Sequence, residues 1–371
     1  MIKVGITGNS GFIGTHLKNW LSLNKKEYKI IDFKNSFFNN SSLLDDFVNK
    51  SDIIVHLSGI NRHNDEKFIY SSNIDMTKKI ISSFKRTQFK GKLIFSSSIQ
   101  EKLSSQFGKS KKRSRLLFES WCSNNDVLFH GLIIPNVFGP FCKPNYNSFI
   151  STFSHNLINN KKSKILVDNN VPLIYIDNLI FKIFHLFKTK KKSKKINIDQ
   201  DIKIKVSEIL LKLNNFKSEY ILNYKVPKLE SKFDLNLFNT FRSYSNYDLY
   251  PIIYKNNIDV RGNFVELIRE NTGGQFSYSI TKPNKTRGNH FHTRKIERFS
   301  VLKGKALIEF RKYGCKKKYS FKLNGEEPSF VDMPLWYTHN IKNIGNEDLI
   351  TSFWINEHYD ENDSDTYYEN V

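Results

Sequence analysis

The sequence has few cysteines and no long apolar run, and each absence excludes a class of protein. Its three cysteines, Cys122, Cys142 and Cys315, form no Cys-x-x-Cys pair, which excludes a disulfide-rich secreted scaffold and a cysteine-based zinc finger. No apolar stretch approaches the ~18 residues of a membrane-spanning helix, and the opening MIKVGITG is typical of a first strand, not of a signal peptide. We therefore expect a soluble protein of the reducing cytoplasm, with no membrane partner.

Acidic residues are also in deficit. The chain has 36 Asp and Glu against 58 Lys and Arg, a formal net charge of +22. The densest basic runs are residues 109–115 (KSKKRSR) and 188–195 (KTKKKSKK), but the other cations are spread along the chain. We interpret the charge as a solvated surface that suits an anionic substrate such as a nucleotide sugar, and we do not expect a nucleic-acid partner.

The many aromatic residues and the length of the chain indicate folded domains. The 31 Phe and 17 Tyr exclude a disordered chain. A length of 371 residues predicts two or three domains at the usual ~100–200 residues each.

A glycine-rich turn stands between an apolar strand at residues 2–6 and an amphipathic helix. Gly8 permits a tight turn, Gly11 lets the backbone approach a pyrophosphate, and Gly14 allows the helix to pack closely on the strand. The pyrophosphate then sits at the helix N-terminus, whose free N–H groups and dipole favour an anion. This context predicts dinucleotide binding.

Later strands carry further candidate residues at their ends. Strand 28–31 ends at Asp32, which favours NAD through the ribose hydroxyl, and Lys34 just beyond favours NADP, so the choice between the coenzymes stays open. Strand 52–57 runs into Ser58 and Gly59, and strand 92–95 ends in a cluster of three serines. Alternation of these strands with helices at 66–84 and 108–121 predicts a doubly wound parallel sheet, the α/β Rossmann fold.

This half resembles the extended short-chain dehydrogenase/reductases, which include nucleotide-sugar epimerases and dehydratases. The matching residues are 6–14 (ITGNSGFIG), 52–59 (DIIVHLSG), Asn73 and the serines 96–98. In that family a Ser, and the Tyr and Lys of a Tyr-x-x-x-Lys motif, act on the substrate carbonyl. The resemblance implies that the coenzyme is bound by Gly8, Gly11, Phe12, Ile13, Gly14, Asp32, Lys34, Leu57, Ser58, Gly59, Asn73 and Lys111.

One departure falls on the catalytic chemistry. The spacing that gives Tyr and Lys in the family gives Phe107 and Lys111 here, after the serines Ser97 and Ser98. Phenylalanine has no O–H with which to protonate an alkoxide, and loss of a general acid costs ~10²–10⁴ in rate. A second departure is Ile133, where an Arg is expected. The reductase half is therefore expected to be slow, inactive, or kept as a scaffold, unless Ser97, Ser98 or water compensates.

Residues 135–153 (PNVFGPFCKPNYNSFISTF) resemble the substrate segment of the CapF (also WbjC or FnlB) group of bifunctional capsular-polysaccharide enzymes. The similarity extends over essentially the whole chain and implies a UDP-2-acetamido-2,6-dideoxy-4-keto-hexose as substrate, on the route to UDP-N-acetyl-L-fucosamine. In this group a cupin domain epimerises C3 and the reductase then uses NADPH on the C4 ketone. The implied substrate residues are Asn136, Lys143, Asn145 and Asn147, and a homodimer is expected.

From about residue 246 the sequence becomes a series of short strands, which predicts an all-β cupin (jelly-roll) domain. His290 and His292 alternate on a strand and so share one face. With Glu297 and His339 they resemble the two cupin motifs, although Asn284 and Trp336 stand where those motifs have glycine. Three imidazoles and a carboxylate suit a divalent metal, zinc foremost, with Fe, Mn or Ni also compatible. The alternative is four unrelated polar residues on a barrel wall, which the matching spacing disfavours.

Residues 259–267 and 286–292 also resemble the metal-independent cupin epimerases of dTDP-keto-sugars, where the residue at the position of His290 is a base. His290 therefore has two candidate roles, metal ligand or base. Tyr337 is a candidate proton donor or a core aromatic residue.

The predicted organisation is a Rossmann domain at 1–245 and a metal-binding cupin at 246–371. The leading interpretation is a C3-epimerase and C4-reductase. The alternatives are a cupin epimerase whose reductase half is inactivated by Phe107, and a non-catalytic NAD(P)- or sugar-binding protein.

Overall fold

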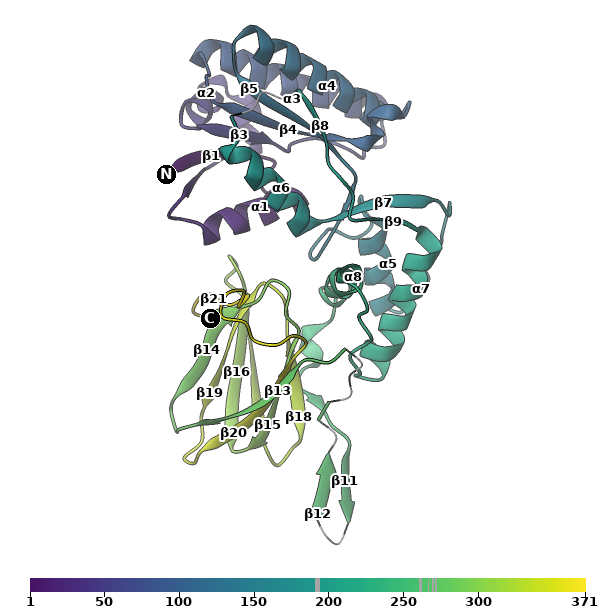
Figure 1. The fold of residues 1–371 in the computed structure, drawn as a ribbon, viewed down its shortest axis with the longest axis vertical. Coiled ribbons are helices and arrows are strands. Elements are labelled where there is room, and N and C mark those ends of the chain that lie inside the picture. Colours follow the sequence, from purple (N-terminus) through teal and green to yellow (C-terminus); the bar gives the residue numbers. More distant parts are fainter. Residues whose placement is uncertain (191–193, 260–261, 266, 269, 271) are drawn as a thin grey trace. The chain divides into compact units, whose positions relative to one another are not determined.

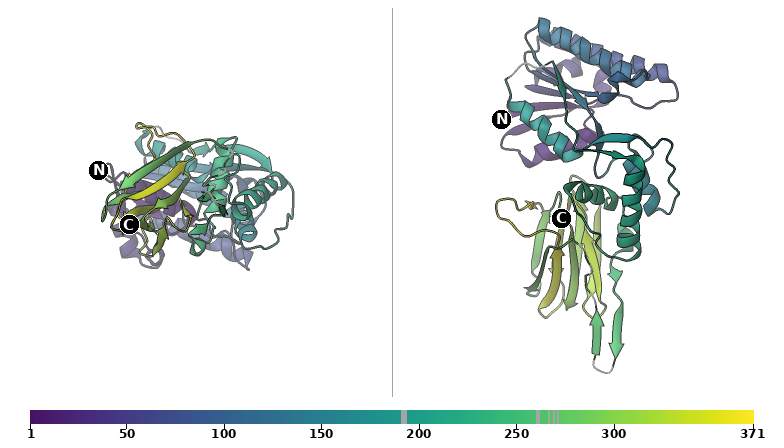
Figure 2. Two further views of the ribbon diagram at one scale, coloured as in Figure 1. Left: turned by 90° about the horizontal axis from the view of Figure 1, so that it is seen from below. Right: turned by 45° about the vertical axis from the view of Figure 1, so that its right-hand side comes forward.

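The computed structural model describes residues 1–190, 194–259, 262–265, 267–268, 270 and 272–371 (Figures 1 and 2). The chain divides into two compact units. The first consists of Met1–Thr152 and Lys164–Ile209, and the second of Phe153–Ser163 and Leu210–Val371. Helices α5 (Phe149–Ile158) and α7 (Val206–Phe216) each begin in the first unit and end in the second.

The first unit is built on a six-stranded parallel sheet in the order β2-β1-β3-β4-β5-β8. The central strands are buried on both faces, as expected of a parallel sheet covered by helices on both sides. The strands are β1 (Ile2–Thr7), β2 (Tyr28–Ile31), β3 (Ile53–His56), β4 (Lys92–Ser98), β5 (Leu128–Ile134) and β8 (Lys195–Asn197). This arrangement confirms the predicted Rossmann-like fold.

Helices cover both faces of this sheet (Figure 2). Helix α1 packs with α6 on one face, and α3 packs between α2 and α4 on the other. A smaller sheet, β6-β7-β9, follows the main one. The bounds are α1 (Phe12–Leu23), η1 (Asn35–Asn39), α2 (Ser41–Asn49), α3 (Glu66–Thr87), η2 (Ile99–Lys102), α4 (Gln106–Asn124), β6 (Asn136–Phe138), β7 (Asn170–Tyr175), α6 (Ile176–Lys188) and β9 (Ile202–Lys205).

A core rich in phenylalanine fixes the α2-α3-α4 face. Phe47, Phe84, Phe95 and Phe118 are fully buried there. A buried cation fixes the other face, because Lys92 Nζ donates to the carbonyls of Leu186, Phe187 and Thr189 at the end of α6, at 2.6 to 2.7 Å. These last carbonyls of a helix have no partner within the helix, so the ammonium group caps it.

The second unit contains two antiparallel five-stranded sheets, in the orders β10-β18-β15-β20-β13 and β17-β16-β19-β14-β21, which confirms the all-β expectation (Figure 1). The strands are β10 (Ile252–Ile253), β13 (Gln275–Thr281), β14 (Thr286–Phe291), β15 (Glu297–Lys303), β16 (Lys305–Lys312), β17 (Lys318–Asn324), β18 (Ser329–Met333), β19 (Tyr337–Asn343), β20 (Leu349–Ile355) and β21 (Tyr367–Tyr368). A separate hairpin joins β11 (Asn256–Asp259) to β12 (Gly262–Val265).

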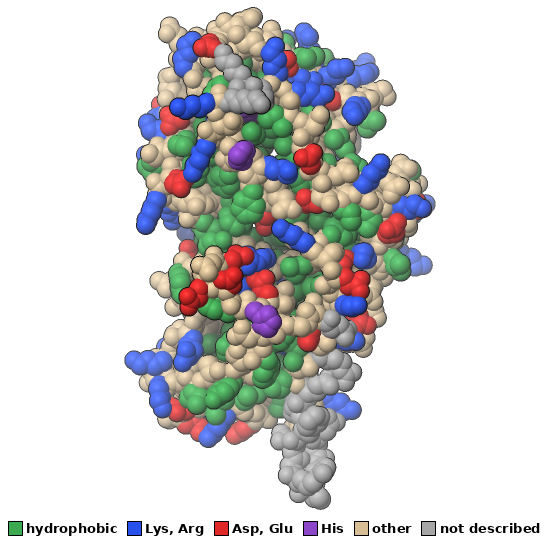
Figure 3. All heavy atoms as spheres, viewed as in Figure 1, with side chains coloured by type: hydrophobic (Ala, Val, Ile, Leu, Met, Phe, Trp, Pro, Cys, Tyr) green, Lys and Arg blue, Asp and Glu red, His purple; other side chains and the backbone are tan. Residues whose placement is uncertain are grey.

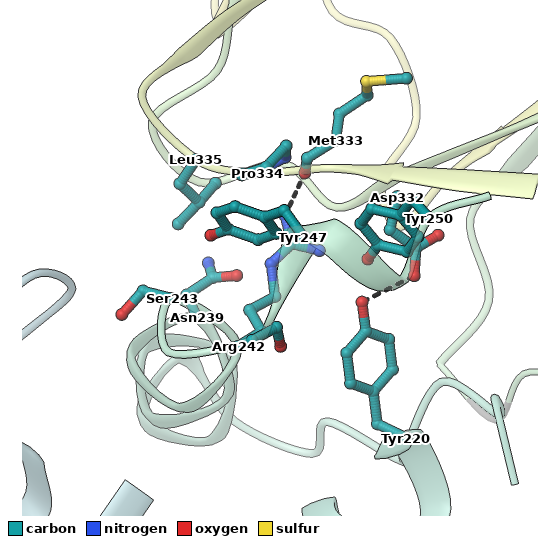
Figure 4. Close-up of a pocket in the computed structure, with 11 residues that line it drawn as sticks. Tyr220, Asn239, Arg242, Ser243, Tyr247, Tyr250, Asp332, Met333, Pro334 and Leu335 are labelled. Carbon is teal, nitrogen blue, oxygen red and sulfur yellow. Dashed lines mark hydrogen bonds between the residues drawn. The ribbon is translucent and has the colours of Figure 1, made fainter. Parts of the chain in front are cut away.

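Three helical segments before the first strand of these sheets pack on them. They are η3 (Lys217–Leu222), α8 (Lys232–Arg242) and the short η4 (Tyr247–Leu249). Figure 4 shows Arg242 of α8 donating through Nη2 to the carbonyl of Met333, at 2.7 Å, and Tyr220 donating to Asp332, at 2.6 Å. The change to a β pattern near residue 246 therefore falls inside the second compact unit, which already includes Leu210.

The surface has no single basic face in the view of Figure 3, where Lys and Arg are interspersed with Asp, Glu and neutral side chains. Of the basic run 188–195, residues 191–193 lie outside the described part of the chain. No helix within the described residues has the length and apolar character needed to cross a bilayer.

Candidate active sites

The glycine turn has the geometry that a pyrophosphate cradle requires. Gly8 has a φ of +71°, and a Cβ on Gly14 would stand 2.2 Å from the carbonyl oxygen of Gly8. Helix α1 begins after Gly11, and no side chain caps it. Phe12 and Ile13 form its first turn and are half-buried. The turn therefore leaves backbone N–H groups and the positive end of the helix dipole for an anion.

The turn lies at the point where the strand order reverses, between β1 and β3. Open α/β sheets bind ligands at such a point, outside the carboxyl ends of the strands. The segment Leu57, Ser58 and Gly59 leaves β3 at the same place, since a Cβ on Gly8 would be 2.8 Å from the Ser58 amide nitrogen. The structure thus brings two separately predicted coenzyme segments together.

Asn73 holds this segment from α3. Its Oδ1 accepts from the Ile60 amide at 2.7 Å, and its Nδ2 donates to the Ile60 carbonyl at 2.8 Å and to Ser110 Oγ at 2.9 Å. The side chain is buried and its amide is used by the protein. Asn73 therefore positions the loop after β3, and its predicted contact with a coenzyme stays a prediction.

Asp32 and Lys34 both follow β2 and are exposed. Because β2 pairs in parallel with β1, they lie at the same edge of the sheet as the glycine turn. Between them, the Phe33 carbonyl accepts from Asn9 Nδ2 at 2.9 Å. The contacts favour neither NAD nor NADP.

Lys111 is buried on α4. Its Nζ donates to the Ser96 carbonyl at 2.8 Å and lies 5.0 Å from the ring centre of Phe95 and 5.8 Å from that of Phe107. A Cβ on Gly59 would be 3.2 Å from this nitrogen, so Lys111 belongs to the coenzyme edge. Burial lowers the pKa of Lys111 to about 8, with Glu101 opposing the shift.

The two predicted catalytic serines differ in their contacts. The Ser97 hydroxyl donates to Glu101, whose carboxylate also accepts two hydrogen bonds from the Arg115 guanidinium, both at 2.9 Å. Ser98 Oγ accepts from the Gln100 amide at 3.1 Å, which leaves its own O–H to donate. Ser98 is therefore better placed than Ser97 to hydrogen-bond a substrate carbonyl.

The interpretation of residues 109–115 as a solvated basic run is wrong in part. Lys111 and Arg115 are buried, while Lys109, Lys112 and Arg113 are exposed. Helical periodicity separates these two sets, because positions 111 and 115 share one face of α4. That spacing was the signal that could have identified Arg115 as a buried residue.

The predicted substrate residues lie on and after β6. Asn136 Nδ2 donates to the Pro172 carbonyl at 3.2 Å, and Lys143, Asn145 and Asn147 are exposed on the loop before α5. Arg62, which no motif in the sequence singled out, donates through Nη1 to the carbonyls of Asn145 and Tyr146. It ties the loop after β3 to the predicted substrate segment. Ile133 is buried in β5, so this position offers no cation to a substrate.

In the second unit, four predicted metal ligands converge. The ligand atoms of His290, His292, Glu297 and His339 all lie within 4.8 Å of one another. His290 and His292 come from β14, Glu297 begins β15, and His339 is opposite His290 on β19. Glu297 Oε2 lies 3.0 Å from His292 Nε2 and 3.2 Å from His339 Nε2.

The hydrogen bonds of two of these histidines orient the rings for a cation. Nδ1 of His292 lies 2.5 Å from the Asp365 carbonyl and Nδ1 of His339 lies 3.1 Å from the Tyr337 carbonyl. A carbonyl only accepts, so both Nδ1 atoms carry hydrogen and the Nε2 atoms can present lone pairs to the cluster. These two Nε2 atoms and Glu297 Oε2 are buried without a hydrogen-bond donor. Such a donor-free set fits a divalent metal.

The charges within the cluster are coupled. Burial alone lowers the pKa of His292, but the neighbouring Glu297 outweighs burial and raises it. The two histidines hold the pKa of Glu297 well below its ordinary value, although burial opposes them. Burial and the two other imidazoles lower the pKa of His290 to about 3, so His290 is neutral at physiological pH.

Asp365 supports this cluster and was not predicted. Its buried carboxylate accepts from the amides of Thr293, Arg294 and Lys295 at 2.9 to 3.2 Å and from the Thr293 hydroxyl at 2.6 Å. Its own carbonyl orients His292. It stands in the acidic stretch 360–365, where no spacing distinguishes it from its neighbours.

The two positions that lack the motif glycines keep the backbone that glycine favours. Asn284 has a φ of +62° and Trp336 a φ of +59°. Trp336 is buried with its ring 5.3 Å from that of Phe291. Tyr337 packs its ring 5.6 Å from Phe310 and 5.4 Å from Tyr247, in an aromatic environment that raises its pKa by burial. Its role as a proton donor stays a prediction.

Part of the predicted similarity to dTDP-keto-sugar epimerases, at 259–267, concerns residues 260, 261 and 266, which lie outside the described residues. The matching position, His290, lies in the cluster of predicted metal ligands.

Comparison with known proteins decides the family. Residues 4–199 match the NAD dependent epimerase/dehydratase family, and residues 257–367 match the polysaccharide biosynthesis C-terminal domain. The chain belongs to the NAD dependent epimerase/dehydratase family. This membership confirms the predicted resemblance to the reductase superfamily and the prediction of an enzyme.

Three relatives of this family member illustrate the similarity. The UDP-2-acetamido-2,6-beta-L-arabino-hexul-4-ose reductase of Pseudomonas aeruginosa is 28% identical over 99% of this chain and 98% of its own length. The capsular polysaccharide assembling protein CapF of Staphylococcus aureus is 30% identical with all of both chains covered, at a TM-score of 0.63. RMD of Pseudomonas aeruginosa, solved with NADPH, shares the fold at 16% identity and a TM-score of 0.53, over 59% of this chain and 84% of its own.

Proposed function

We propose that this enzyme acts twice on a UDP-linked 2-acetamido-2,6-dideoxy-4-keto-hexose. The cupin half would epimerise C3 and the Rossmann half would reduce the C4 ketone. The observation that carries the proposal is that one chain holds both a glycine turn beside a buried lysine and a donor-free cluster of three His and one Glu. The full-length similarity to a UDP-keto-hexose reductase supports the same substrate class. A ketone suits both sites, since it accepts hydride and acidifies the neighbouring C–H bond.

In the Rossmann half, Gly8, Gly11 and Gly14 would bind the pyrophosphate of NADPH or NADH through backbone N–H groups. The bound coenzyme would supply hydride to C4. The Ser98 hydroxyl would donate a hydrogen bond to the ketone oxygen. Lys111 would place a positive charge next to the nicotinamide ribose, as the family resemblance implies.

In the cupin half, His290, His292, Glu297 and His339 would hold a divalent metal, zinc foremost. Such a metal would supply Lewis acidity toward the ketone and so make the C3 proton easier to remove. The neutral His290 imidazole suits the role of a metal ligand, which needs an unprotonated nitrogen. The role of base stays a candidate, although so low a pKa makes a weak base at neutral pH. Tyr337 would return a proton on the opposite face.

A second candidate function is epimerisation without reduction. The phenyl ring of Phe107 favours it, because this position carries no hydroxyl within reach of a substrate. In that case the Rossmann half would bind coenzyme or sugar without hydride transfer.

The experiment that separates the two is the product mass after incubation with the UDP-4-keto sugar, NADPH, Zn²⁺ and heavy water. A reduced product with one carbon-bound deuterium supports both activities, and exchange without coenzyme oxidation supports the second candidate. His339→Ala should abolish exchange and, because reduction follows epimerisation, the reduction of this substrate with it. Gly14→Val should abolish coenzyme oxidation and leave exchange in place, because a side chain there meets the Gly8 carbonyl at 2.2 Å. If the enzyme catalysed neither exchange nor reduction, both candidate functions would be refuted.

We also propose that the enzyme works as a homodimer in the cytoplasm, as the family resemblance implies. Sedimentation equilibrium with the intact chain tests the oligomeric state, and a mass of 43.6 kDa would refute the dimer.

A further inference from the structure

We infer that Lys111 is the proton donor of the ketone reduction, taking the role that tyrosine has in the reductase superfamily. The inference rests on the proposed reductase activity and assigns a catalytic residue to it.

The first argument is the chemistry of position 107. Phe107 and Lys111 lie four residues apart on α4, and thus on one face of the helix. The Phe107 ring centre is 5.8 Å from Lys111 Nζ. The ring therefore lies beside the ammonium group as a tyrosine ring would, but it carries no hydroxyl and has no proton to give.

The second argument is the environment of the nitrogen. One of its three N–H groups donates to the Ser96 carbonyl, and the rings of Phe95 and Phe107 flank it. Its close approach to Gly59, where a Cβ would be 3.2 Å away, puts it at the carboxyl ends of β3 and β4. A ketone bound beside the nicotinamide at this edge would meet an N–H group of Lys111.

The neighbouring titratable groups do not replace Lys111. Glu101, on η2, accepts two hydrogen bonds from the Arg115 guanidinium and one from the Ser97 hydroxyl, so its carboxylate oxygens are engaged by the protein. His56, at the end of β3, has a pKa lowered to about 3 by burial and by the Lys111 charge, so it carries no extra proton near neutral pH. Ser98 can hydrogen-bond the ketone, but its hydroxyl is a far weaker acid than an ammonium group.

Burial makes this ammonium a suitable acid, because its pKa of about 8 keeps it charged at neutral pH and close to the operating pH of a general acid. In the step, C4 gains hydride from the reduced coenzyme and its C=O π bond breaks toward oxygen. An N–H bond of Lys111 breaks, the O–H bond of the alcohol forms, and the electron pair stays on Nζ. Solvent then reprotonates the amine.

The test is the pH profile of coenzyme oxidation at saturating UDP-4-keto sugar, for the wild type, Lys111→Arg, Phe107→Tyr and the double variant. We expect the wild-type rate to fall above pH ~8. Lys111→Arg keeps a cation that does not release its proton, so the rate should drop ~10²–10⁴-fold and the alkaline limb should disappear. Adding Phe107→Tyr to the Lys111→Arg variant should raise its rate at least about tenfold, because the phenol supplies a proton again.

Lys109→Arg is the matched control, since Lys109 is exposed on the same helix, and its rate and profile should be those of the wild type. Binding of the reduced coenzyme, followed by its fluorescence, reports whether the Rossmann unit of each variant remains folded. A Lys111→Arg enzyme that loses only coenzyme affinity, with the alkaline limb intact, would overturn the inference. The inference would also be overturned if the alkaline limb of the Phe107→Tyr variant stayed at its wild-type pH. This measurement does not need the Lys111→Arg variant to fold. A wild type that never oxidises NADPH would instead refute the proposed reduction itself.

Discussion

The most informative perturbation of the cupin half is Asp365→Ala, because one side chain links the C-terminal segment to the cluster of predicted metal ligands. The Asp365 carboxylate accepts from three successive amides, residues 293–295, and from the Thr293 hydroxyl. These amides directly follow His292, whose ring is oriented by the Asp365 carbonyl. Removing the carboxylate should therefore loosen both the turn and the ligand.

The magnitude follows from the contacts. Each hydrogen bond to a charged acceptor contributes about 1.5–3 kcal/mol, and a buried donor left without a partner costs about 1–3 kcal/mol. Four donors lose their acceptor, but they share one carboxylate and water can enter a loosened turn, so the costs do not add. We expect a loss of about 4 kcal/mol in the free energy of unfolding of the second unit. Groups that orient metal ligands in this way change metal affinity by about 10–100-fold.

Two measurements test the reasoning. Hydrogen exchange of a peptide covering residues 293–295 should accelerate strongly in Asp365→Ala, and Zn²⁺ affinity by chelator competition should fall about 10–100-fold. Asp363→Ala is the control, because Asp363 is on the same segment and its carboxylate is paired with Arg294 at the surface. Unchanged exchange and unchanged zinc affinity in Asp365→Ala would refute the role assigned to the carboxylate.

Three further predictions concern stability. Trp336→Gly relieves about 1–2 kcal/mol of left-handed backbone strain but removes a buried ring that contributes about 3–5 kcal/mol, so urea unfolding should show a net loss of stability of about 2–3 kcal/mol. Asn284→Gly is the control, because Asn284 is exposed and has a similar φ, and it should change stability by less than about 0.5 kcal/mol. Lys92→Met leaves three carbonyls at the end of α6 without their donor and should lower stability by about 3 kcal/mol; a loss below about 1 kcal/mol would contradict the capping role. The pKa of Lys111 is lowered from 10.5 to about 8, so its buried charge opposes folding below pH 8 and this penalty is relieved between pH 8 and 10.5. Over that window the free energy of unfolding of the wild type should rise by up to about 3 kcal/mol relative to that of Lys111→Met. Parallel curves of unfolding free energy against pH for the two proteins would refute this prediction.

The sequence predicted those parts of the sites that are local in the chain. The glycines at 8, 11 and 14 act within one strand, turn and helix, so their spacing is enough to define the cradle. His290 and His292 share a face because a strand alternates its side chains. His339 is distant in sequence, and it was found only because the second cupin motif has a recognisable spacing.

The supporting residues could not be predicted, because their partners are far apart and have no fixed spacing. Asp365 reaches back over 70 residues to the turn after His292. Arg62 reaches residues 145 and 146 from a loop whose sequence carries no motif. Arg115 was missed for a different reason, since its burial follows from the helical face it occupies and not from the composition of its run.

The departures from the family motifs are of two physical kinds, and this difference decides which activity they put at risk. At Trp336 the backbone hydrogen bonds remain, from its own amide to the His292 carbonyl at 2.8 Å and from the Tyr313 amide to its carbonyl at 2.7 Å. These bonds, with the ring packed on Phe291, hold a left-handed residue without glycine, and the four predicted metal ligands still converge. At Phe107 the missing group is a proton donor, which packing cannot supply. The cupin chemistry should therefore survive its departures, while the reductase chemistry depends on a proton from another residue, and among the described groups Lys111 is the one that the geometry favours.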